Sequence, residues 1–360
     1  MKLLYISHGH PLLEADDCLT FKKLGIDYFS TGYYADSDKP GDLPRIENKF
    51  QKEHDELFRK QHRQSSNAEQ LGSLPWRKNH EWTGLEIKNQ IIFNNEFLDI
   101  FDCILISHNI ENLFLNDNLW NRKVFVKTFS MHSLEYDRIL QEFPHVKRIK
   151  TTPNYIFRGE VAGDYTIRQS AVISEEELGK GWTGENRTVC TFSSFMSHPA
   201  PEMRRRTAHY LEVIKHLNKF GIIAESFGAA NDNFGHGFIS HEEKIDILQR
   251  YRSNLCIGTP GTYYTYSTIE SLVMGQPIVM FGKDLYQSDI YEADSIIKHG
   301  INGFIGNTPE ECANYIKILN DDIDLAYEIG REARKTGISV FGREVISQKW
   351  KDMFVTEGLL

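Results

Sequence analysis

Short apolar runs alternate with helical patterns along the chain, and this alternation constrains the fold more than any other feature. Such a pattern indicates βαβ units and parallel sheets. In the first half it predicts strands at 2–7, 27–32, 102–108, 123–129 and 148–152, separated by helices at 13–24, 47–64, 85–99 and 133–142. In the second half it predicts strands at 188–194, 222–228, 254–259, 277–282 and 303–306.

The polar stretch 175–186 separates the two series and predicts a linker between two doubly wound α/β domains. The polar, irregular region 33–90 predicts an insertion or a long loop. If the two domains face each other, the carboxyl ends of both sheets border one cleft, where folds of this class bind ligands.

Two helices of the second half carry clear local signals. Residues Thr308, Pro309 and Glu311 predict a capping box that opens a helix at 309–319. In the helix predicted at 202–219, one face carries residues spaced three or four positions apart, and we expect this face to be buried. Its residues are Met203, Thr207, Tyr210, Leu211, Ile214 and Leu217.

Composition and small motifs exclude several classes of protein. The 360 residues hold 41 Lys+Arg against 50 Asp+Glu, a net charge of −9, which argues against a basic nucleic-acid-binding module. The five cysteines show no zinc-site spacing, and Asp36-Ser37-Asp38 is interpreted as a turn. The N-terminal apolar run is too short for a signal peptide, and none reaches the ~20 residues that span a membrane, so a cytoplasmic protein is expected.

The segment 254–282 is the most informative for function. A buried strand runs into a loop rich in Gly, Thr and Tyr, and a short helix then ends at Gly275. The first amides of such a helix can bind an anion, and Ser267 and Thr268 would add hydroxyl donors. Glu270 could accept hydrogen bonds from a ribose diol, or could simply suit the positive end of the helix dipole.

This segment resembles the nucleotide-sugar half of GT-B glycosyltransferases, particularly the family-4-like retaining group. The likeness rests on the run from Ile269 to Val279, on HGINGFIG at 299–306 and on the closing segment 331–354. It implies an acceptor-side domain at 1–175, a nucleotide-sugar-binding domain at 176–340 and a last helix at 341–360 that returns to the first domain. It also implies a nucleoside-diphosphate sugar as co-substrate, with no cofactor and no metal.

Donor-side roles follow from the same resemblance. The family often has a second glutamate eight positions before the one that matches Glu270, but this chain has Thr262, so Tyr263, Tyr264 or a loop amide would fill that space. An arginine would grip the diphosphate, and Arg204 or Arg205 is the expected one, although a solvated basic face is the alternative. Gly9, after the first strand, would lie close to the diphosphate.

Histidines mark the other side of the expected cleft. His132 matches the family histidine near the transferred sugar, and His108 competes with it for that place. His8 and His10 are expected on the acceptor side, and no third ligand supports a metal there.

Three functions remain open from the sequence. The first is a metal-independent, retaining glycosyltransferase that acts on a hydroxyl, for example of a saccharide. The second is a viral-type DNA glycosyltransferase that modifies a hydroxymethylated pyrimidine. The segment 143–168 supports it, because this segment has a net charge of +3 and could follow a nucleic-acid backbone. Its charged residues are Lys147, Arg148, Lys150, Arg158 and Arg168 against Glu160 and Asp164. The third is a non-catalytic nucleotide-sugar-binding protein of the same fold.

Overall fold

The structure is a computed structural model that divides the chain into two compact units. Unit 1 comprises Met1–Ile167 and Ser347–Leu360, and unit 2 comprises Arg168–Ile346. The residues described are 1–8, 11–32, 48–61, 63–64, 91–108, 110–128, 140–141, 143–153, 163–193, 196–228, 235–259, 264–286 and 291–360.

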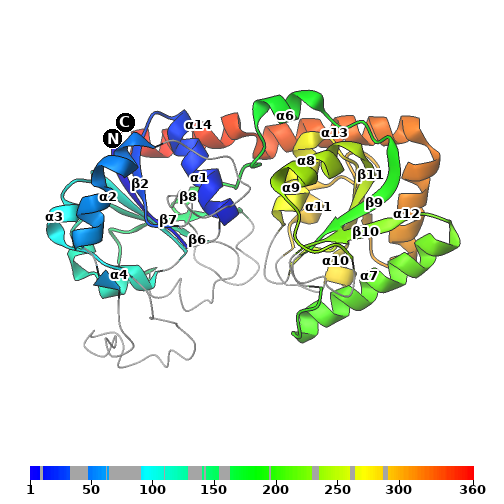
Figure 1. Cartoon of the computed structure of the whole chain (residues 1–360), viewed down its shortest axis with the longest axis horizontal. Coiled ribbons are helices and arrows are strands. Elements are labelled where there is room, and N and C mark those ends of the chain that lie inside the picture. Colours follow the sequence, from blue (N-terminus) through cyan, green and yellow to red (C-terminus); the bar gives the residue numbers. More distant parts are fainter. Residues whose placement is uncertain are drawn as a thin grey trace. The chain divides into compact units, whose positions relative to one another are not determined.

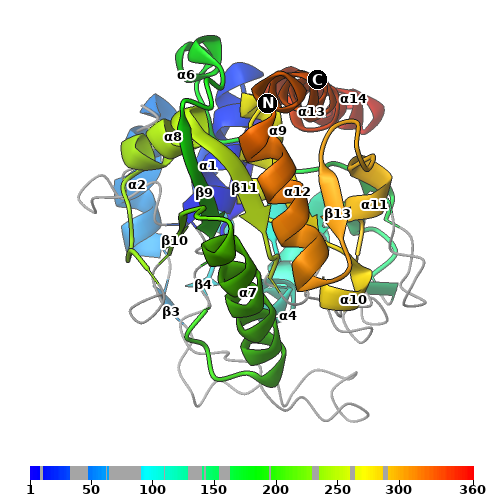
Figure 2. The ribbon, with the colours of Figure 1, turned by 90° about the vertical axis from the view of Figure 1, so that its right-hand side faces the viewer.

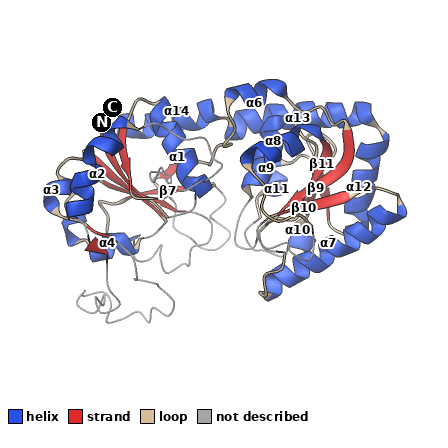
Figure 3. Cartoon of the chain, viewed as in Figure 1, coloured by secondary structure: helices blue, strands red, loops and turns tan. Residues whose placement is uncertain are grey.

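Unit 1 is a doubly wound parallel sheet (Figures 1 and 3). Within the described residues the sheet has six strands, in the order β2 (Asp27–Ser30), β1 (Lys2–Ile6), β5 (Cys103–Ser107), β6 (Val124–Thr128), β7 (Lys147–Lys150) and β8 (Tyr165–Thr166). Its helices are α1 (Pro11–Lys23), α2 (Lys49–Gln61), α3 (Asn95–Leu98), α4 (Glu111–Leu115) and the 3₁₀ turn Asp117–Leu119.

The two faces of this sheet are covered by different helices. Alternate strand residues such as Leu4 and Val126 join Phe97 of α3 in one core. On the other face the last helix, α14 (Arg343–Thr356), inserts the fully buried Trp350, whose ring lies 5.4 Å from that of Phe21 in α1. The predicted return of the C-terminal helix to the first domain is therefore confirmed.

A buried ion pair lies on this second face of the sheet. Lys127 of β6 pairs with Asp17 of α1, and both side chains are 1% exposed. Tyr5 donates to the other carboxylate oxygen of Asp17 over 3.1 Å, and the Lys127 ammonium lies 5.3 Å from the centroid of the Trp350 ring. Breaking such a pair by removing one partner is costly, so α1, β6 and α14 are fixed together.

Unit 2 repeats the architecture (Figures 1 and 2). Within the described residues its sheet has five parallel strands, in the order β10 (Ala224–Phe227), β9 (Asn186–Phe192), β11 (Tyr251–Cys256), β12 (Ile278–Phe281) and β13 (Phe304–Gly306). Its helices are α6 (Glu175–Lys180), α7 (Pro201–Lys219), α8 (His241–Arg250), α9 (Tyr266–Met274), α10 (Lys283–Tyr286), α11 (Ala293–Ile296), α12 (Pro309–Asp321) and α13 (Ile323–Phe341).

The helices of unit 2 form two layers. On one face α7 and α12 pack side by side (Figure 2), and on the other α13 lies along α9, with α8 beside α9. Gly337 of α13 allows this close packing, because a Cβ there would lie 2.5 Å from the backbone carbon of Leu272 in α9.

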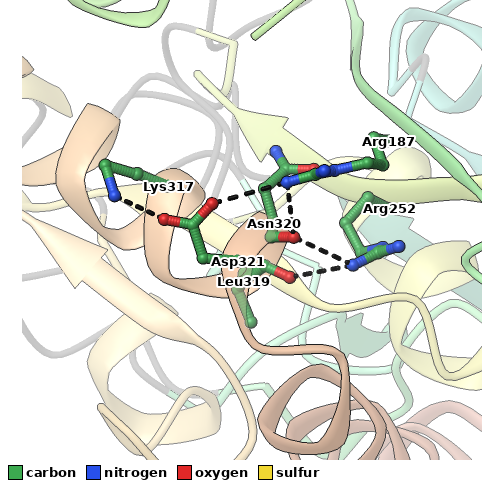
Figure 4. Close-up of polar contacts among 6 residues, drawn as sticks. All are labelled: Arg187, Arg252, Lys317, Leu319, Asn320 and Asp321. Atoms are coloured by element: carbon green, nitrogen blue, oxygen red, sulfur yellow. Dashed lines mark hydrogen bonds and ion pairs between the residues drawn. The ribbon is translucent and has the colours of Figure 1, made fainter. Parts of the chain in front are cut away.

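At the amino-terminal ends of β9 and β11, two arginines donate hydrogen bonds to the last turn of α12 (Figure 4). Arg252 of β11 donates to the carbonyls of Leu319 and Asn320, both over 3.3 Å, and Arg187 of β9 donates to Asn320 over 3.1 Å. Cations suit the negative end of a helix dipole. We therefore assign this cluster to the stability of the fold.

Several local expectations need correction. The stretch 175–186 is no open linker, because Ser174 caps helix α6 and Trp182 packs at 5.2 Å from Tyr327 of α13. The expected helix at 85–99 is wrong over its described part: Ile91–Ile92 forms β4, which pairs antiparallel with β3 (Arg63–Gln64), and only α3 follows, capped by Asn94.

Two helix details also differ from expectation. On α7, Leu211 is 39% exposed, whereas Val213 and Arg206 are buried, because the buried stripe is rotated toward them. At α12, Thr308 accepts from the amide of Glu311 as predicted, but the Glu311 carboxylate accepts from the amide of Asn307 instead of that of Thr308. The second hydrogen bond of the capping box is thus made by the residue before the N-cap.

Candidate functional site

The strand order of unit 2 identifies a ligand-binding edge. The chain leaves β9 toward β10 on one side and returns to β11 on the other, so the connections diverge where β9 and β11 lie side by side. In open α/β sheets, ligands bind beyond the carboxyl ends of the strands at this switch point. Phe192 ends β9, and Cys256 ends β11 before the loop that leads to α9.

Three hydroxyls meet at the N-terminus of α9. The side chain of Thr265, the residue before the helix, makes no capping bond to the backbone. Its Oγ1 lies 2.8 Å from the hydroxyl of Ser267 and 3.1 Å from that of Thr268. The structure thus brings the two predicted hydroxyl residues together at a helix end whose dipole favours negative charge.

Glu270 lies one turn further along α9, where it is fully buried. Its Oε2 forms an ion pair with Lys244 of α8, a side chain that is 16% exposed. Among the described residues, Oε1 accepts no hydrogen bond. A buried carboxylate oxygen with this unused capacity, beside a switch point, is a candidate acceptor for ligand hydroxyls.

The arginine run divides between the surface and the interior. Arg204 and Arg205 are exposed on the second turn of α7, and the diphosphate-binding role expected of one of them stays a prediction. Arg206 is 2% exposed and donates to the carbonyl of Tyr286 over 2.6 Å and to that of Ile257 over 3.4 Å. It therefore braces the segments that follow β12 and β11.

Tyr264 is a core residue of unit 2. Its ring packs edge-on against Phe341 at 5.0 Å, and the guanidinium of Arg168 lies 5.7 Å from its centroid. Arg168 in turn binds the fully buried carboxylate of Glu292 through both terminal nitrogens, one of them over 2.9 Å. This packing fixes the loop just before α9.

In unit 1, His8 and His108 meet at the corresponding switch point. They follow the adjacent strands β1 and β5, and their rings lie edge-on at 4.7 Å. Burial lowers the pKa of His108 to about 3, and the His8 ring adds to this shift, so the imidazole of His108 is neutral at physiological pH. The backbone φ of His108 is +66°, a left-handed conformation that is uncommon outside glycine.

A buried carboxylate stands beside this pair and was not expected from the sequence. Glu14 of α1 is fully buried and accepts hydrogen bonds from the hydroxyls of Ser7, which follows β1, over 3.0 Å and of Ser30, which ends β2, over 2.5 Å. The sequence marks Glu14 only as an acidic residue among the apolar residues that begin a helix. Gly32 leaves room for it, because a Cβ there would lie 2.0 Å from its Oε2.

Several predicted residues fall outside the described part of the chain. These are Gly9, His10, Asp36, Asp38, His132, Thr262 and Tyr263. Their expected roles therefore stay predictions.

The basic segment 143–168 is described in part, and its basic side chains differ in exposure, from 38% for Lys147 to 4% for Lys150. Lys147 and Arg148 both approach Asp164, at 3.9 Å, and Lys150 is 4% exposed. Arg168 forms an ion pair with the buried carboxylate of Glu292. Arg158 and Glu160 lie outside the described residues, so the basic rim that would favour a DNA substrate stays a prediction.

Two kinds of feature are absent from the part of the chain that the structure describes. No three His, Cys, Asp or Glu side chains cluster there as metal ligands would. Likewise, none of the helices described has the length and apolar character needed to cross a bilayer.

No protein-family model and no curated protein matches the sequence. Solved structures match the fold. Sucrose-phosphate synthase from Thermosynechococcus elongatus is 12% identical with a TM-score of 0.61, covering 99% of this chain and 99% of that chain. Anabaena HepE in complex with UDP and glucose is 14% identical with a TM-score of 0.62, covering 99% of this chain and 100% of that chain.

A third similar structure is S. aureus TarM with UDP, 16% identical with a TM-score of 0.53, in which the match covers 75% of this chain but 61% of that chain. This chain has the GT-B glycosyltransferase fold. The fold that the sequence resemblance implied is therefore confirmed, with its doubly wound units and returning C-terminal helix.

Proposed function

We propose that this GT-B chain is a glycosyltransferase that uses a nucleoside-diphosphate sugar. The observation that carries the proposal is Glu270, a buried carboxylate with an unused acceptor oxygen next to the hydroxyl-lined N-terminus of α9. A ribose diol matches the carboxylate, and a diphosphate matches the helix end. HepE, one of the similar structures, was solved with UDP-glucose, UDP, and UDP and glucose.

In this proposal the chemistry is the transfer of a sugar to an acceptor hydroxyl. The bond between the anomeric carbon and the diphosphate oxygen breaks, a bond to the acceptor oxygen forms, and the acceptor proton passes to the departing phosphate. The α9 amides, the hydroxyls of Ser267 and Thr268, and Arg204 or Arg205 would stabilise the charge that develops on the diphosphate. Retention at the anomeric carbon and independence from metal are part of the proposal, on the basis of the family resemblance.

The acceptor side is proposed at the switch point of unit 1. The neutral imidazole of His108 and the adjacent His8 ring offer nitrogen atoms to a polar acceptor. Holding the acceptor hydroxyl against the anomeric carbon would supply proximity, a large part of the rate enhancement of such reactions.

Nucleotide binding tests this proposal. Thermal unfolding is measured with UDP, GDP and ADP, and at a concentration of 100 times Kd a bound nucleotide adds about 2.7 kcal/mol of stability. Glu270→Gln should weaken binding by about 10-fold or more, since a hydrogen bond to a charged group contributes about 1.5–3 kcal/mol. Glu328→Gln, at an exposed position on α13, is the matched control. Unchanged affinity in Glu270→Gln would remove the assignment.

A further inference from the structure

Lys244 lies where two features of the candidate site meet. Its ammonium pairs with Oε2 of Glu270 on α9 and lies 5.9 Å from the centroid of the Phe192 ring, which ends β9. The helix that carries it, α8, lies beside α9 (Figure 1). Lys244 therefore joins both sides of the switch point of unit 2.

The position of this lysine runs against the electrostatics of its own helix. Ser240 and Glu243 form a complete capping box, so α8 begins at His241 and Lys244 is its fourth residue. The positive end of the helix dipole favours the acidic residues Glu242 and Glu243 there and disfavours a cation. The Glu270 carboxylate compensates for that cost.

Glu270 depends on Lys244 in turn. A carboxylate that is fully buried needs a counter-charge, and Lys244 supplies it. Other titratable groups packed against α9 contact it elsewhere: Cys256 of β11 faces Thr268, and Arg334 of α13 donates to the carbonyl of Met274 at the far end of the helix. Because Lys244 occupies Oε2, Oε1 stays available to a ligand.

We propose that Lys244 is a positioning residue for nucleotide binding. It pairs with Oε2 of the Glu270 carboxylate and fixes the rotamer of that side chain, so that Oε1 is presented to a ribose hydroxyl. This inference rests on the proposed function, and it predicts that the whole effect of Lys244 on nucleotide affinity is transmitted through Glu270.

A double-mutant cycle tests the inference, with UDP, GDP and ADP as probes in calorimetric titrations of the full chain. Lys244→Met should weaken the nucleotide that binds the wild type by at least 10-fold. In the Glu270→Gln background the same substitution should change affinity by less than 2-fold. Lys244→Arg, which keeps the charge, should stay within about 3-fold of wild type.

Two controls separate positioning from general stability. Lys215→Met removes a lysine that pairs with Glu212 on the exposed side of α7, and it should leave affinity unchanged. Leu217→Ala opens the core of unit 2 near the end of α7, and it should lower stability without loss of affinity.

The possible failures are distinguishable. An equal loss from Lys244→Met in both backgrounds, or no loss in wild type, overturns the role of Lys244 and leaves the proposed function standing. Unchanged affinity in Glu270→Gln removes Glu270 from nucleotide binding and overturns the role of Lys244 with it, whereas no nucleotide binding by the wild type overturns the proposed function itself. If Lys244→Met does not fold, two other proteins are measured instead: Lys244→Arg and the double variant Lys244→Met with Glu270→Gln. A 10-fold loss of nucleotide affinity in Lys244→Arg then overturns the inference. A 10-fold loss in the double variant relative to Glu270→Gln alone also overturns it.

Discussion

Replacing Arg206 by methionine tests how the candidate site is held in place. The sequence RRR at 204–206 offers three arginines, and the structure buries only the third. Methionine keeps much of the side-chain volume but removes the charge and the donors. Arg205→Met, one residue earlier on the exposed face of α7, removes the same groups from a solvated position.

The expected loss follows from the contacts of the guanidinium. The short bond to the Tyr286 carbonyl and the long bond to the Ile257 carbonyl come from a charged donor and contribute about 3 kcal/mol together. The Tyr286 ring, whose centroid lies 4.0 Å from the guanidinium carbon, adds about 2 kcal/mol in this desolvated setting.

Part of that stabilisation is offset by the cost of burying a charge. The same burial lowers the pKa of Arg206. Taking the offset as about 2 kcal/mol, we expect Arg206→Met to lower the free energy of unfolding by about 3 kcal/mol. That is about 6–12 °C in Tm for a unit of this size, whereas Arg205→Met should stay within about 0.5 kcal/mol.

Chemical denaturation of the purified variants measures both values. The reasoning is refuted if Arg206→Met loses less than about 1 kcal/mol, or if Arg205→Met loses as much. In either case Arg206 would not brace the segments that follow β11 and β12.

Two further perturbations test other parts of the structure. The neutral, buried imidazole of His108 makes unit 1 less stable as pH falls below 6.5, because the unfolded chain takes up a proton that the folded chain refuses down to about pH 3. His108→Asn, which tolerates a positive φ, should therefore reduce the loss of stability between pH 7 and pH 5 by about 2 kcal/mol, and equal slopes would contradict this. Gly337→Ala should lower the free energy of unfolding by about 1–3 kcal/mol, because the new Cβ would clash with the backbone at Leu272. Gly179→Ala, which has open space around it, should not lower it. Similar urea midpoints for the two variants would contradict this prediction.

The sheets could be predicted because their determinants are local. Central strands of a parallel sheet are buried on both faces, so segments such as 103–107 and 278–281 stand out as apolar runs. The shortest strands gave no such signal. Tyr165–Thr166 and Ile91–Ile92 span two residues each and exist through their pairing with partners elsewhere in the chain.

The candidate site could be predicted only in part. Glu270, Ser267 and Thr268 stand at recognisable positions after a strand and a loop, and the structure places them on α9. Lys244, by contrast, reaches Glu270 across 26 positions of sequence through the packing of α8 on α9, and no local pattern encodes that contact. A lysine just inside a capped, acidic helix start was the signal that could have marked it.

The arginine run shows the limit of periodicity arguments. Adjacent helix residues diverge by about 100°, so one arginine of three was expected to differ from the others. Which one points inward depends on the rotation of α7 against the sheet. The buried Met203, Tyr210 and Leu217 fix that rotation and bring Arg206 into the interior.

The central claim is that this chain transfers sugar from a nucleoside diphosphate, and release of nucleoside diphosphate measures it most directly. Purified protein is incubated with UDP-, GDP-, ADP- and dTDP-sugars, and release is followed with and without Glu270→Gln. The account predicts release from one class of donor, slow with water alone, and reduced about 10-fold or more by the substitution at sub-saturating donor. Folded protein that neither binds nor cleaves any of these donors would contradict it.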